Sequence, residues 1–366
     1  MKKNLIIFMP SIEGGGVEKN LFIISNYLSN ELKNVTIITS TNKFNNKFNN
    51  INIINPSFRF KKHHGRKLRY LFCLLQLIKL IFKQDKKVLV LAFQANLYCA
   101  IICKIFNVKI ITRSNSSPSG WSNNFIKKFV YRIFLKIPNK VIVNSNEFKH
   151  ELKKKFNVNP ICIFNPLNKK EILKKSKEKV NLNFFNVKKK IIKIIFVGRF
   201  VDQKDPLTFL KALMSINNKI NFRALMIGRG ILKKKMINFI KINKLNKKIK
   251  LLNFQNNPYK YIEKSDLLVL TSKFEGLPNV LLEAQVLKKF IISSNCPTGP
   301  KEILLKGNAG LLFEMKNFEE LANKIQYFNK NRLKLKEKIS NGTKNINRFD
   351  YYKSLNKYLK VVNNLI

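Results

Sequence analysis

The stretch IIKIIFVGRFVDQKDPLTFLKAL, residues 191–213, contains the pattern from which the fold class is predicted. Residues 191–197 form an apolar run of mostly β-branched and aromatic side chains, which predicts a strand buried on both faces. Gly198 ends this run, and Asp205 followed by Pro206 supplies a helix N-cap and a first helical position. We therefore predict a strand, a polar loop and a helix, the repeating unit of a parallel α/β sheet.

The same alternation continues outward along the chain, with helical patterns such as residues 17–32 and 147–156 between short apolar runs. It predicts an α/β fold of two tandem, doubly wound, Rossmann-like domains that face each other across a cleft. Ligands of such sheets bind at the carboxyl ends of the strands. The predicted strands are residues 5–9, 35–39, 88–92, 109–112, 140–143, 161–164, 191–197, 222–227, 249–253, 267–270, 290–293 and 310–313.

A chain of 366 residues is long for one compact domain, so two are expected. Residues 166–190 are polar and rich in lysine, and an Asn-Pro turn signal introduces them. We place an N-terminal domain at residues 1–165, a linker at 166–190 and a C-terminal domain at 191–347. Residues 348–366 predict an amphipathic terminal helix.

The charge balance is unusual, with 71 basic against 20 acidic residues and a net charge of +51. Coding bias toward Lys, Asn, Ile and Phe is one explanation, and a polyanionic partner, nucleic acid or anionic membrane, is the other. The densest basic patches are residues 59–70 and 125–136. The second suits a helix lying on an acidic bilayer and suits equally an amphipathic helix with a solvated face.

The five cysteines are odd in number and scattered, which predicts no disulfide framework and a reducing, cytoplasmic setting. Cys99 and Cys103 lie on an apolar stretch and indicate core packing rather than metal binding. The nearest candidate for a membrane span, residues 70–82, is too short and contains Lys79. We expect no signal peptide.

Two chemistry-bearing stretches fall at predicted strand ends in the second half. Between Gly198 and the helix at Pro206 stand Arg199 and Lys204, two cations suited to a diphosphate, although a random Arg and Lys would be unremarkable in so basic a chain. FEGLPNVLLEAQ, residues 274–285, places Glu275 in a loop and Glu283 on a helix. Carboxylates accept hydrogen bonds from sugar hydroxyls, so a nucleotide sugar would satisfy both stretches.

A third stretch, PSIEGGGVEK at residues 10–19, follows the first predicted strand and opens a helix. Consecutive glycines allow close backbone approach to a ligand, and the helix start offers free N–H groups to an anion. A bare turn would need no ligand at all.

Together these stretches resemble the retaining family 4 glycosyltransferases (glycosyl transferases group 1), which have the GT-B fold. The likeness covers nearly the whole chain. NCPTGPKEIL, residues 295–304, further resembles a subgroup that adds hexoses or N-acetylhexosamines to undecaprenyl-diphosphate-linked glycans. That subgroup includes N-acetylgalactosaminyltransferases of O-antigen, capsule or N-glycan assembly.

The resemblance implies a role for each matching residue. Arg199 and Lys204 would bind the donor diphosphate, Glu275 would stabilise positive charge on the transferred sugar, and Glu283 would hold the ribose. The leaving phosphate itself would assist the acceptor hydroxyl. The remaining donor-binding residues are Gly198, Gly276, Leu277, Pro278, Asn279, Gly15 and Gly16, with Glu18 as a possible donor or acceptor contact. The terminal helix 348–366 would pack back on the first domain.

One departure from the family concerns the strand at residues 109–112, after which many relatives carry a His that contacts the donor sugar. Here Arg113, Ser114 and Asn115 follow, and we expect Ser114 or Asn115 to make a weaker contact. The sequence has no D-x-D motif, which argues against the metal-dependent GT-A fold. We expect no cofactor and no metal, only a nucleotide-sugar cosubstrate.

These observations predict a retaining glycosyltransferase that moves a hexose or N-acetylhexosamine, with GalNAc a candidate, from a UDP-sugar to a lipid-linked glycan. Its setting would be bacterial O-antigen, capsule or glycan assembly, at the inner face of the cytoplasmic membrane and in contact with anionic lipid. The alternatives are a basic nucleic-acid-binding α/β protein and a catalytically inactive sugar-nucleotide-binding protein. The sequence shows no nucleic-acid-binding module, and we expect no specific nucleic acid partner.

Overall fold

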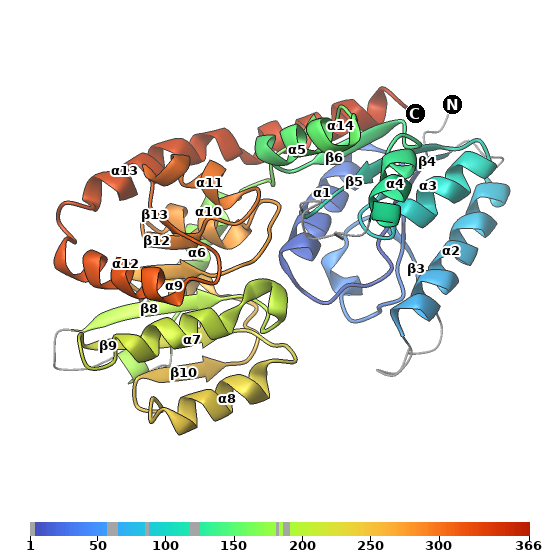
Figure 1. The fold of residues 1–366 in the computed structure, drawn as a ribbon. Helices are drawn as coiled ribbons and strands as arrows, with labels where there is room; N and C mark the ends of the chain where they lie inside the picture. The colour runs from blue at the N-terminus through green and yellow to red at the C-terminus, as the bar shows by residue number, and fades with distance from the viewer. Residues whose placement is uncertain (1–3, 57–64, 85–87, 117–124, 181–182, 186–190) are drawn as a thin grey trace. The chain divides into compact units, whose positions relative to one another are not determined.

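The computed structural model describes the chain except for residues 1–3, 57–64, 85–87, 117–124, 181–182 and 186–190. The chain divides into two compact units. The first comprises residues 1–166 together with 351–366, and the second comprises residues 167–350. Each unit is a parallel sheet covered by helices (Figure 1). The prediction of an α/β fold with two Rossmann-like domains is confirmed.

The first sheet has seven strands in the order β3-β2-β1-β4-β5-β6-β7, every pair of them parallel. Its centre is apolar throughout, since each residue of β4 is buried, as expected for a strand covered on both faces. The strands are β1 (Asn4–Phe8), β2 (Asn34–Ile38), β3 (Asn52–Ile54), β4 (Val88–Ala92), β5 (Lys109–Arg113), β6 (Lys140–Val143) and β7 (Ile161–Cys162).

Different helices cover the two faces of this sheet. Helices α1 and α14 share one core with β1, to which α14 contributes Leu355, Tyr358 and Val362. Helices α2 and α3 share another core on the opposite face. The helices of this unit are α1 (Gly16–Glu31), α2 (Arg66–Lys83), α3 (Asn96–Ile105), α4 (Phe125–Phe134), α5 (Asn146–Phe156) and α14 (Tyr351–Asn363), with the 3-10 turn η1 (Asn45–Lys47).

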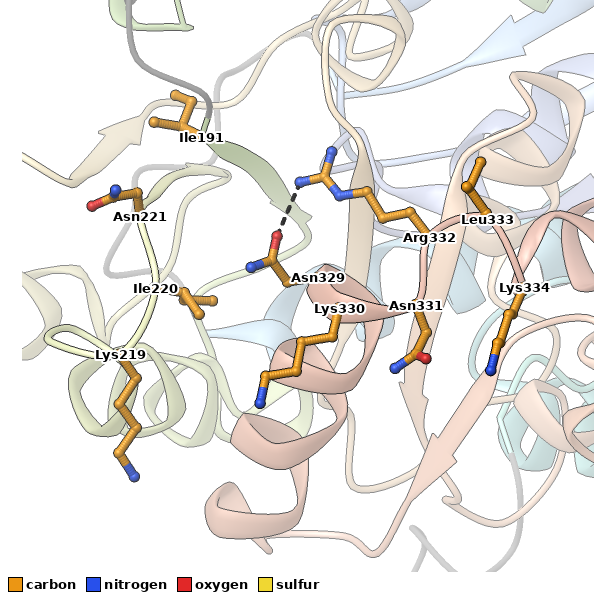
Figure 2. Close-up of a pocket in the computed structure, with 10 residues that line it drawn as sticks. All are labelled: Ile191, Lys219, Ile220, Asn221, Asn329, Lys330, Asn331, Arg332, Leu333 and Lys334. Atoms are coloured by element: carbon orange, nitrogen blue, oxygen red, sulfur yellow. Dashed lines mark hydrogen bonds between the residues drawn. The ribbon is translucent and has the colours of Figure 1, made fainter.

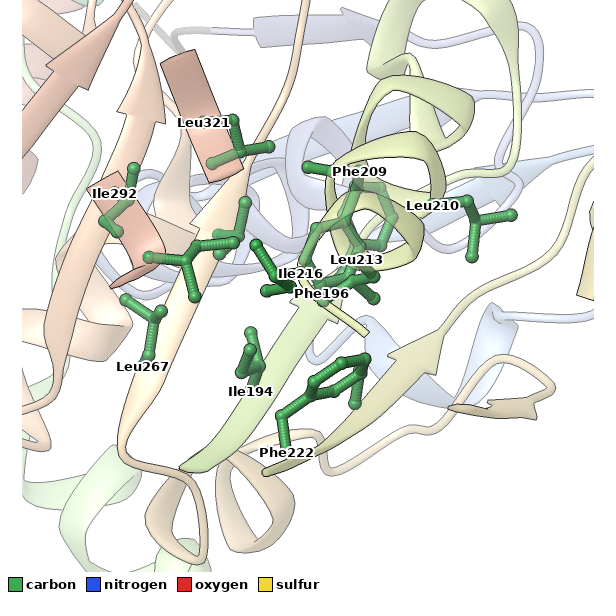
Figure 3. Close-up of a cluster of buried hydrophobic side chains, with 14 of the residues drawn as sticks. Ile194, Phe196, Phe209, Leu210, Leu213, Ile216, Phe222, Leu267, Ile292 and Leu321 are labelled. Atoms are coloured by element: carbon green, nitrogen blue, oxygen red, sulfur yellow. The ribbon is translucent and has the colours of Figure 1, made fainter. Parts of the chain in front are cut away.

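The second sheet has six parallel strands in the order β10-β9-β8-β11-β12-β13. Its main core is built on β8, where Phe196 stacks on Phe209 of helix α7 (Pro206–Ser215) with ring centroids 6.0 Å apart (Figure 3). Aromatic and branched side chains of these two elements interdigitate, which fixes the loop between them. The strands are β8 (Ile192–Val197), β9 (Phe222–Ile227), β10 (Ile249–Leu252), β11 (Leu267–Leu270), β12 (Phe290–Ser294) and β13 (Leu311–Phe313).

The second unit is covered by eight helices within the part of the chain that the structure describes. They are α6 (Lys169–Ser176), α7 (Pro206–Ser215), α8 (Lys233–Ile242), α9 (Tyr259–Glu263), α10 (Asn279–Val286), α11 (Pro300–Ile303), α12 (Phe318–Lys330) and α13 (Lys336–Asn345). Short 3-10 turns complete the connections: η3 (Asn183–Phe185), η4 (Asp202–Lys204), η5 (Leu305–Gly307) and η6 (Ile346–Phe349).

Within the described residues of the segment predicted to be a linker, 166–190, part of the chain is helical. It contains α6, which packs against α9 and α10 of the second unit. The Asn168 side chain accepts a hydrogen bond from the Glu171 backbone N–H at 3.0 Å and caps the helix, and Ile172 is buried. Its many lysines lie around one buried stripe, so a lysine-rich stretch folds as a helix.

Candidate functional site

An ion pair between Lys204 and Glu275 lies at the carboxyl edge of the second sheet. Lys204 ends η4 after β8, and Glu275 follows β11, the strand that pairs with β8. The Lys204 Nζ donates to Oε1 of Glu275, and their side chains are only 17% and 8% exposed. The structure thus brings together the cation and the carboxylate that the sequence placed in two separate stretches.

Hydrogen bonds from side chains to backbone carbonyls hold these two loops together independently of the ion pair. The Thr271 Oγ1 lies 2.8 Å from the carbonyl oxygens of both Lys204 and Asp205. The Gln203 side chain donates to the Phe274 carbonyl at 3.0 Å. Thr271 and Gln203 were not among the predicted site residues, although both stand where a predicted strand or loop ends.

Asp205 caps helix α7 as predicted. Its side chain accepts from the Thr208 backbone N–H at 3.4 Å and from Thr208 Oγ1 at 2.7 Å, and Pro206 is the first helical residue. The backbone of Asp205 lies in the left-handed region, with φ of 43°. This conformation turns the chain sharply after Lys204, so that the lysine meets the Glu275 loop and not the helix.

A third loop supports the Gly276–Pro278 turn from the side of β12. The Thr298 Oγ1 donates to the Glu275 carbonyl at 2.7 Å. Gly299 has φ of 90°, and a Cβ there would lie 2.4 Å from the Gly276 carbonyl oxygen. Only glycine fits so close an approach. Gly276, Leu277 and Pro278 are buried, and α10 begins directly afterward at Asn279.

Glu283 lies on α10, one turn beyond its start, and is buried. The hydroxyl of Tyr259, from α9, donates to its Oε1 at 3.4 Å. Glu275 and Glu283 therefore sit on a loop and on a helix, as the sequence indicated. Tyr259 was missed because nothing in the sequence shows that α9 would face α10.

Arg199 lies in the loop predicted to bind a diphosphate and is accessible to solvent. Its side chain is exposed, and Nη2 donates to Oε1 of Gln203 at 2.9 Å, four residues along the same loop. Gly198 beside it is tightly packed, since a Cβ on Gly228 would lie 1.9 Å from the Gly198 carbonyl oxygen. The guanidinium is thus held on a rigid turn while it faces solvent.

Cys296 is a buried thiol near the ion pair of Lys204 and Glu275. Burial raises the pKa of this thiol to about 12, and the nearby Glu275 carboxylate adds to the increase. The thiol is therefore protonated at neutral pH, which excludes the thiolate form that nucleophilic catalysis requires.

The glycine-rich loop of the first unit begins α1. Gly15 precedes the helix, and the Glu18 side chain folds back over the loop. Its carboxylate accepts from the Gly15 N–H at 2.9 Å and the Glu13 N–H at 3.3 Å. Glu18 thus uses its oxygens on its own loop and is buried, whereas Gly16 is exposed.

The last residue of β5, Arg113, and the residues that follow it are held by hydrogen bonds within the first unit. Arg113 is 1% exposed and donates from Nε to the Tyr358 hydroxyl and from Nη2 to Asn165 Oδ1, both at 2.7 Å. The backbone N–H of Ser114 donates to the Ile142 carbonyl at 2.9 Å. The Asn115 amide donates to the Phe93 carbonyl at 3.0 Å. Both predicted contacts, Ser114 and Asn115, therefore lie at the carboxyl edge of the sheet.

A hollow of about 670 Å³ lies elsewhere in the second unit (Figure 2). Ile191 and Asn221 line it from the amino ends of β8 and β9, and residues 329–334 line it from the end of α12. Because Lys204 and Glu275 occupy the carboxyl ends, this hollow is separate from the site described above. Among the described residues, no group of three or more His, Cys, Asp or Glu side chains gathers as a metal site would require.

Comparison with known proteins identifies related sequences and folds. Residues 177–346 match the sequence profile of the family described as glycosyl transferases group 1. The N-acetylgalactosamine-N,N'-diacetylbacillosaminyl-diphospho-undecaprenol 4-alpha-N-acetylgalactosaminyltransferase of Campylobacter jejuni is 27% identical over 230 residues, 60% of each chain. The O-antigen biosynthesis glycosyltransferase WclY of Escherichia coli is 33% identical over 138 residues, 38% of each chain.

Among solved structures, Anabaena Alr3699/HepE in complex with UDP and glucose superposes with a TM-score of 0.78 over 99% of each chain. At 16% sequence identity this likeness concerns the fold alone. The chain spans about half the length of the curated relatives that it matches first.

Proposed function

We propose that this chain, in which residues 177–346 form a glycosyl transferases group 1 domain within a GT-B fold, transfers a sugar from a nucleotide-sugar donor to a lipid-linked glycan. The observation that carries the proposal is the juxtaposition of Lys204 and Glu275 at the carboxyl edge of the second sheet. This edge is where doubly wound sheets bind nucleotides.

Lys204 and Arg199 would hold the donor diphosphate. The Lys204 ammonium has three N–H donors, so it binds a phosphate oxygen without releasing Glu275. Arg199 presents a fork that matches phosphate oxygens and already stands on a rigid turn. The start of α10, after the buried Gly276–Pro278 turn, adds the positive end of a helix dipole.

Glu275 would face the sugar that is transferred. As the bond from the anomeric carbon to the phosphate oxygen breaks, positive charge develops on the sugar, and a carboxylate stabilises it. A bond to the acceptor oxygen forms, and the acceptor proton passes to the leaving diphosphate. Transfer on one face of the ring retains the anomeric configuration and requires no protein nucleophile and no metal.

Glu283 would hold the ribose hydroxyls, since a buried carboxylate on a helix accepts two such bonds in fixed positions. Gly276, Leu277, Pro278 and Asn279 would surround the sugar and phosphate through their backbone, next to Gly198. In the first unit Gly15, Gly16 and Glu18, with Ser114 and Asn115, would complete the donor or acceptor side.

The printed names of two relatives support a proposal for the transferred group. The Campylobacter jejuni relative is named for transfer of N-acetylgalactosamine to a diphospho-undecaprenol glycan, and the Escherichia coli relative for O-antigen biosynthesis. We therefore infer a UDP-hexose or UDP-N-acetylhexosamine donor, with GalNAc the first to test. The acceptor would be a polyprenyl-diphosphate glycan at the inner face of the cytoplasmic membrane.

The testing experiment measures binding of UDP, GDP and ADP to the whole chain by titration calorimetry. We expect one nucleotide diphosphate to bind, and Arg199→Ala/Lys204→Ala to weaken it by at least about tenfold, because two charge-assisted contacts are lost. Lys234→Ala/Lys235→Ala removes two exposed cations of α8 and serves as the matched control. Equal affinity in both double variants would reject the diphosphate site.

A further inference from the structure

Helix α2 is apolar on two opposite sides. Its inner side is completely buried at Cys73, Leu77 and Ile81. At 100° per residue the opposite side carries large apolar side chains that are 46–56% exposed: Leu68, Leu71, Leu75 and Phe82. A surface helix normally places charged and polar residues opposite its buried stripe. Helix α2 places a single lysine there, Lys79.

Helix α3 repeats this arrangement next to α2. It buries Cys99 and Cys103 and exposes Tyr98 and Ile105 to 51% and 69% on the other side. Both helices cover the same face of the first sheet and lie side by side (Figure 1). We call the surface formed by these exposed side chains the outer apolar face: Leu68, Leu71, Leu75, Phe82, Tyr98 and Ile105.

Ring contacts make the outer apolar face continuous. Tyr70 of α2 meets Tyr98 with ring centroids 6.4 Å apart, and Phe82 meets Phe106 beyond the end of α3 at 5.1 Å. Helix α4, which contacts α3, exposes Phe129 to 57%. Large apolar side chains gathered in one exposed patch are typical of a surface that another molecule covers.

The charges around the face indicate what covers it. Helices α2 and α3 contain no acidic residue, and Asp85 is the only one in the sequence between Glu31 and Glu147. Exposed lysines stand among and beside the apolar side chains at positions 67, 79, 83 and 104. A second copy of the chain would bring like charges together, whereas an anionic bilayer accepts apolar side chains and attracts lysines.

We propose that the outer apolar face docks on an anionic phospholipid surface, with α2 and α3 lying in the plane of the interface. No helix in the described residues is long and apolar enough to span a bilayer. The docking surface extends the proposed function to a location, since a lipid-linked acceptor is presented at such a surface. Vesicle binding needs neither donor nor acceptor, so the two proposals succeed or fail separately.

The first test is co-sedimentation of the whole chain with vesicles of phosphatidylglycerol and phosphatidylcholine in equal parts. We expect Leu71→Ser/Leu75→Ser to lower the partition coefficient by at least about tenfold, because two apolar side chains no longer enter the interface. The matched control is Ile237→Ser/Ile242→Ser on α8, whose side chains are 48% and 77% exposed. It should bind as the wild type does.

The second test separates insertion from electrostatic attraction. Lys79→Gln/Lys83→Gln should weaken binding to these vesicles while leaving the weak binding to pure phosphatidylcholine unchanged. In a Trp121→Phe background, the fluorescence of Leu75→Trp should shift to the blue on adding vesicles, and that of Ile242→Trp should not. Thermal unfolding of each variant confirms that it is folded.

Three outcomes would overturn the docking surface. One is a wild-type chain that does not bind the vesicles, and another is unchanged binding by folded Leu71→Ser/Leu75→Ser. The third is a concentration-dependent dimer of the wild type, detected by light scattering, that is absent in Leu71→Ser/Leu75→Ser. The outer apolar face would then join two copies of the chain. Vesicle binding without any nucleotide binding would leave this proposal standing and reject the proposed function.

Discussion

At the scale of single residues, the ion pair between Lys204 and Glu275 links the proposed binding of the donor diphosphate to the proposed stabilisation of charge on the transferred sugar. Each side chain is more than four-fifths buried, so neither charge is well solvated by water. Removing one partner leaves the other uncompensated. The donor diphosphate would supply a second negative charge next to Lys204. Donor binding and the position of the Glu275 carboxylate would therefore depend on each other.

We predict that Glu275→Gln reduces transfer by at least about a hundredfold, because the neutral amide no longer stabilises positive charge on the sugar. The amide keeps the size of the carboxylate, so the fold should persist. The measurement is release of the nucleotide diphosphate in the presence of the lipid-linked acceptor. Glu314→Gln, on an exposed glutamate of the same unit, is the control. Turnover equal to that of the wild type would remove Glu275 from its assigned role.

The sequence was sufficient for those site residues whose position depends on local chain geometry. Asp205 and Pro206 start α7 because an N-cap and a first-turn proline act within a few residues. The neighbours of Glu275 depend instead on strand order, which brings the loops after β8, β11 and β12 together. Thr298 could not be predicted for that reason, since its contact spans 23 residues of sequence.

At the scale of elements, Arg113 ties helix α14 to the first sheet. Its buried guanidinium lies on β5, stands 5.3 Å from the Phe93 ring and donates to Tyr358 of α14. Arg113 Nη1 has no hydrogen-bond partner among the described residues. Burial raises the pKa of the Tyr358 hydroxyl, while the Arg113 charge opposes that increase. The hydroxyl therefore stays neutral and available as an acceptor.

We predict that Tyr358→Phe lowers the free energy of unfolding by about 1.5–3 kcal/mol, the range for a lost hydrogen bond to a charged group. Urea denaturation measures this change. Tyr352→Phe, on the exposed side of the same helix, should have no effect. The double variant Arg113→Met/Tyr358→Phe should recover part of the loss, because no buried charge then remains unpaired. If Tyr358→Phe and Tyr352→Phe had the same free energy of unfolding, this role of Tyr358 would be contradicted.

Sequence periodicity located the strands to within one or two residues except where an element is short or mixed. Strand β3, with the residues Asn52, Ile53 and Ile54, was missed because three residues carry no period. Helix α6 was hidden in a lysine-rich stretch because only Ile172 and Ser176 of its eight residues are buried. The apolar run at residues 70–82 was recognised, but which of its apolar side chains are buried and which are exposed depends on the packing around the helix.

At the scale of the whole molecule, each of the two units builds its own hydrophobic clusters. The second unit has a core from β8, β9, β11 and their helices, and it contains Arg199, Lys204, Glu275 and Glu283. The first unit draws part of its core from the far end of the sequence. The net charge of +51 is spread along the chain, so it marks no single site.

This asymmetry predicts different behaviour when the units are expressed separately. Residues 167–350 should unfold cooperatively and bind the nucleotide diphosphate within about threefold of the whole chain, because the diphosphate contacts lie in that unit. Residues 1–166 alone should not unfold cooperatively, since they lack Leu355, Tyr358 and Val362 and leave the buried Arg113 without its hydrogen bond to Tyr358. Calorimetric unfolding and titration of each piece measure both expectations.

The decisive control joins residues 351–366 to the first unit through a flexible glycine-serine linker. Cooperative unfolding should return with that helix and should be lost again when Tyr358→Phe and Leu355→Ser are introduced together. Cooperative unfolding of residues 1–166 by themselves would show that α14 only covers a finished core. Loss of nucleotide affinity in residues 167–350 would instead assign part of the diphosphate site to the first unit, where the glycine-rich loop Gly14–Gly16 leads into helix α1.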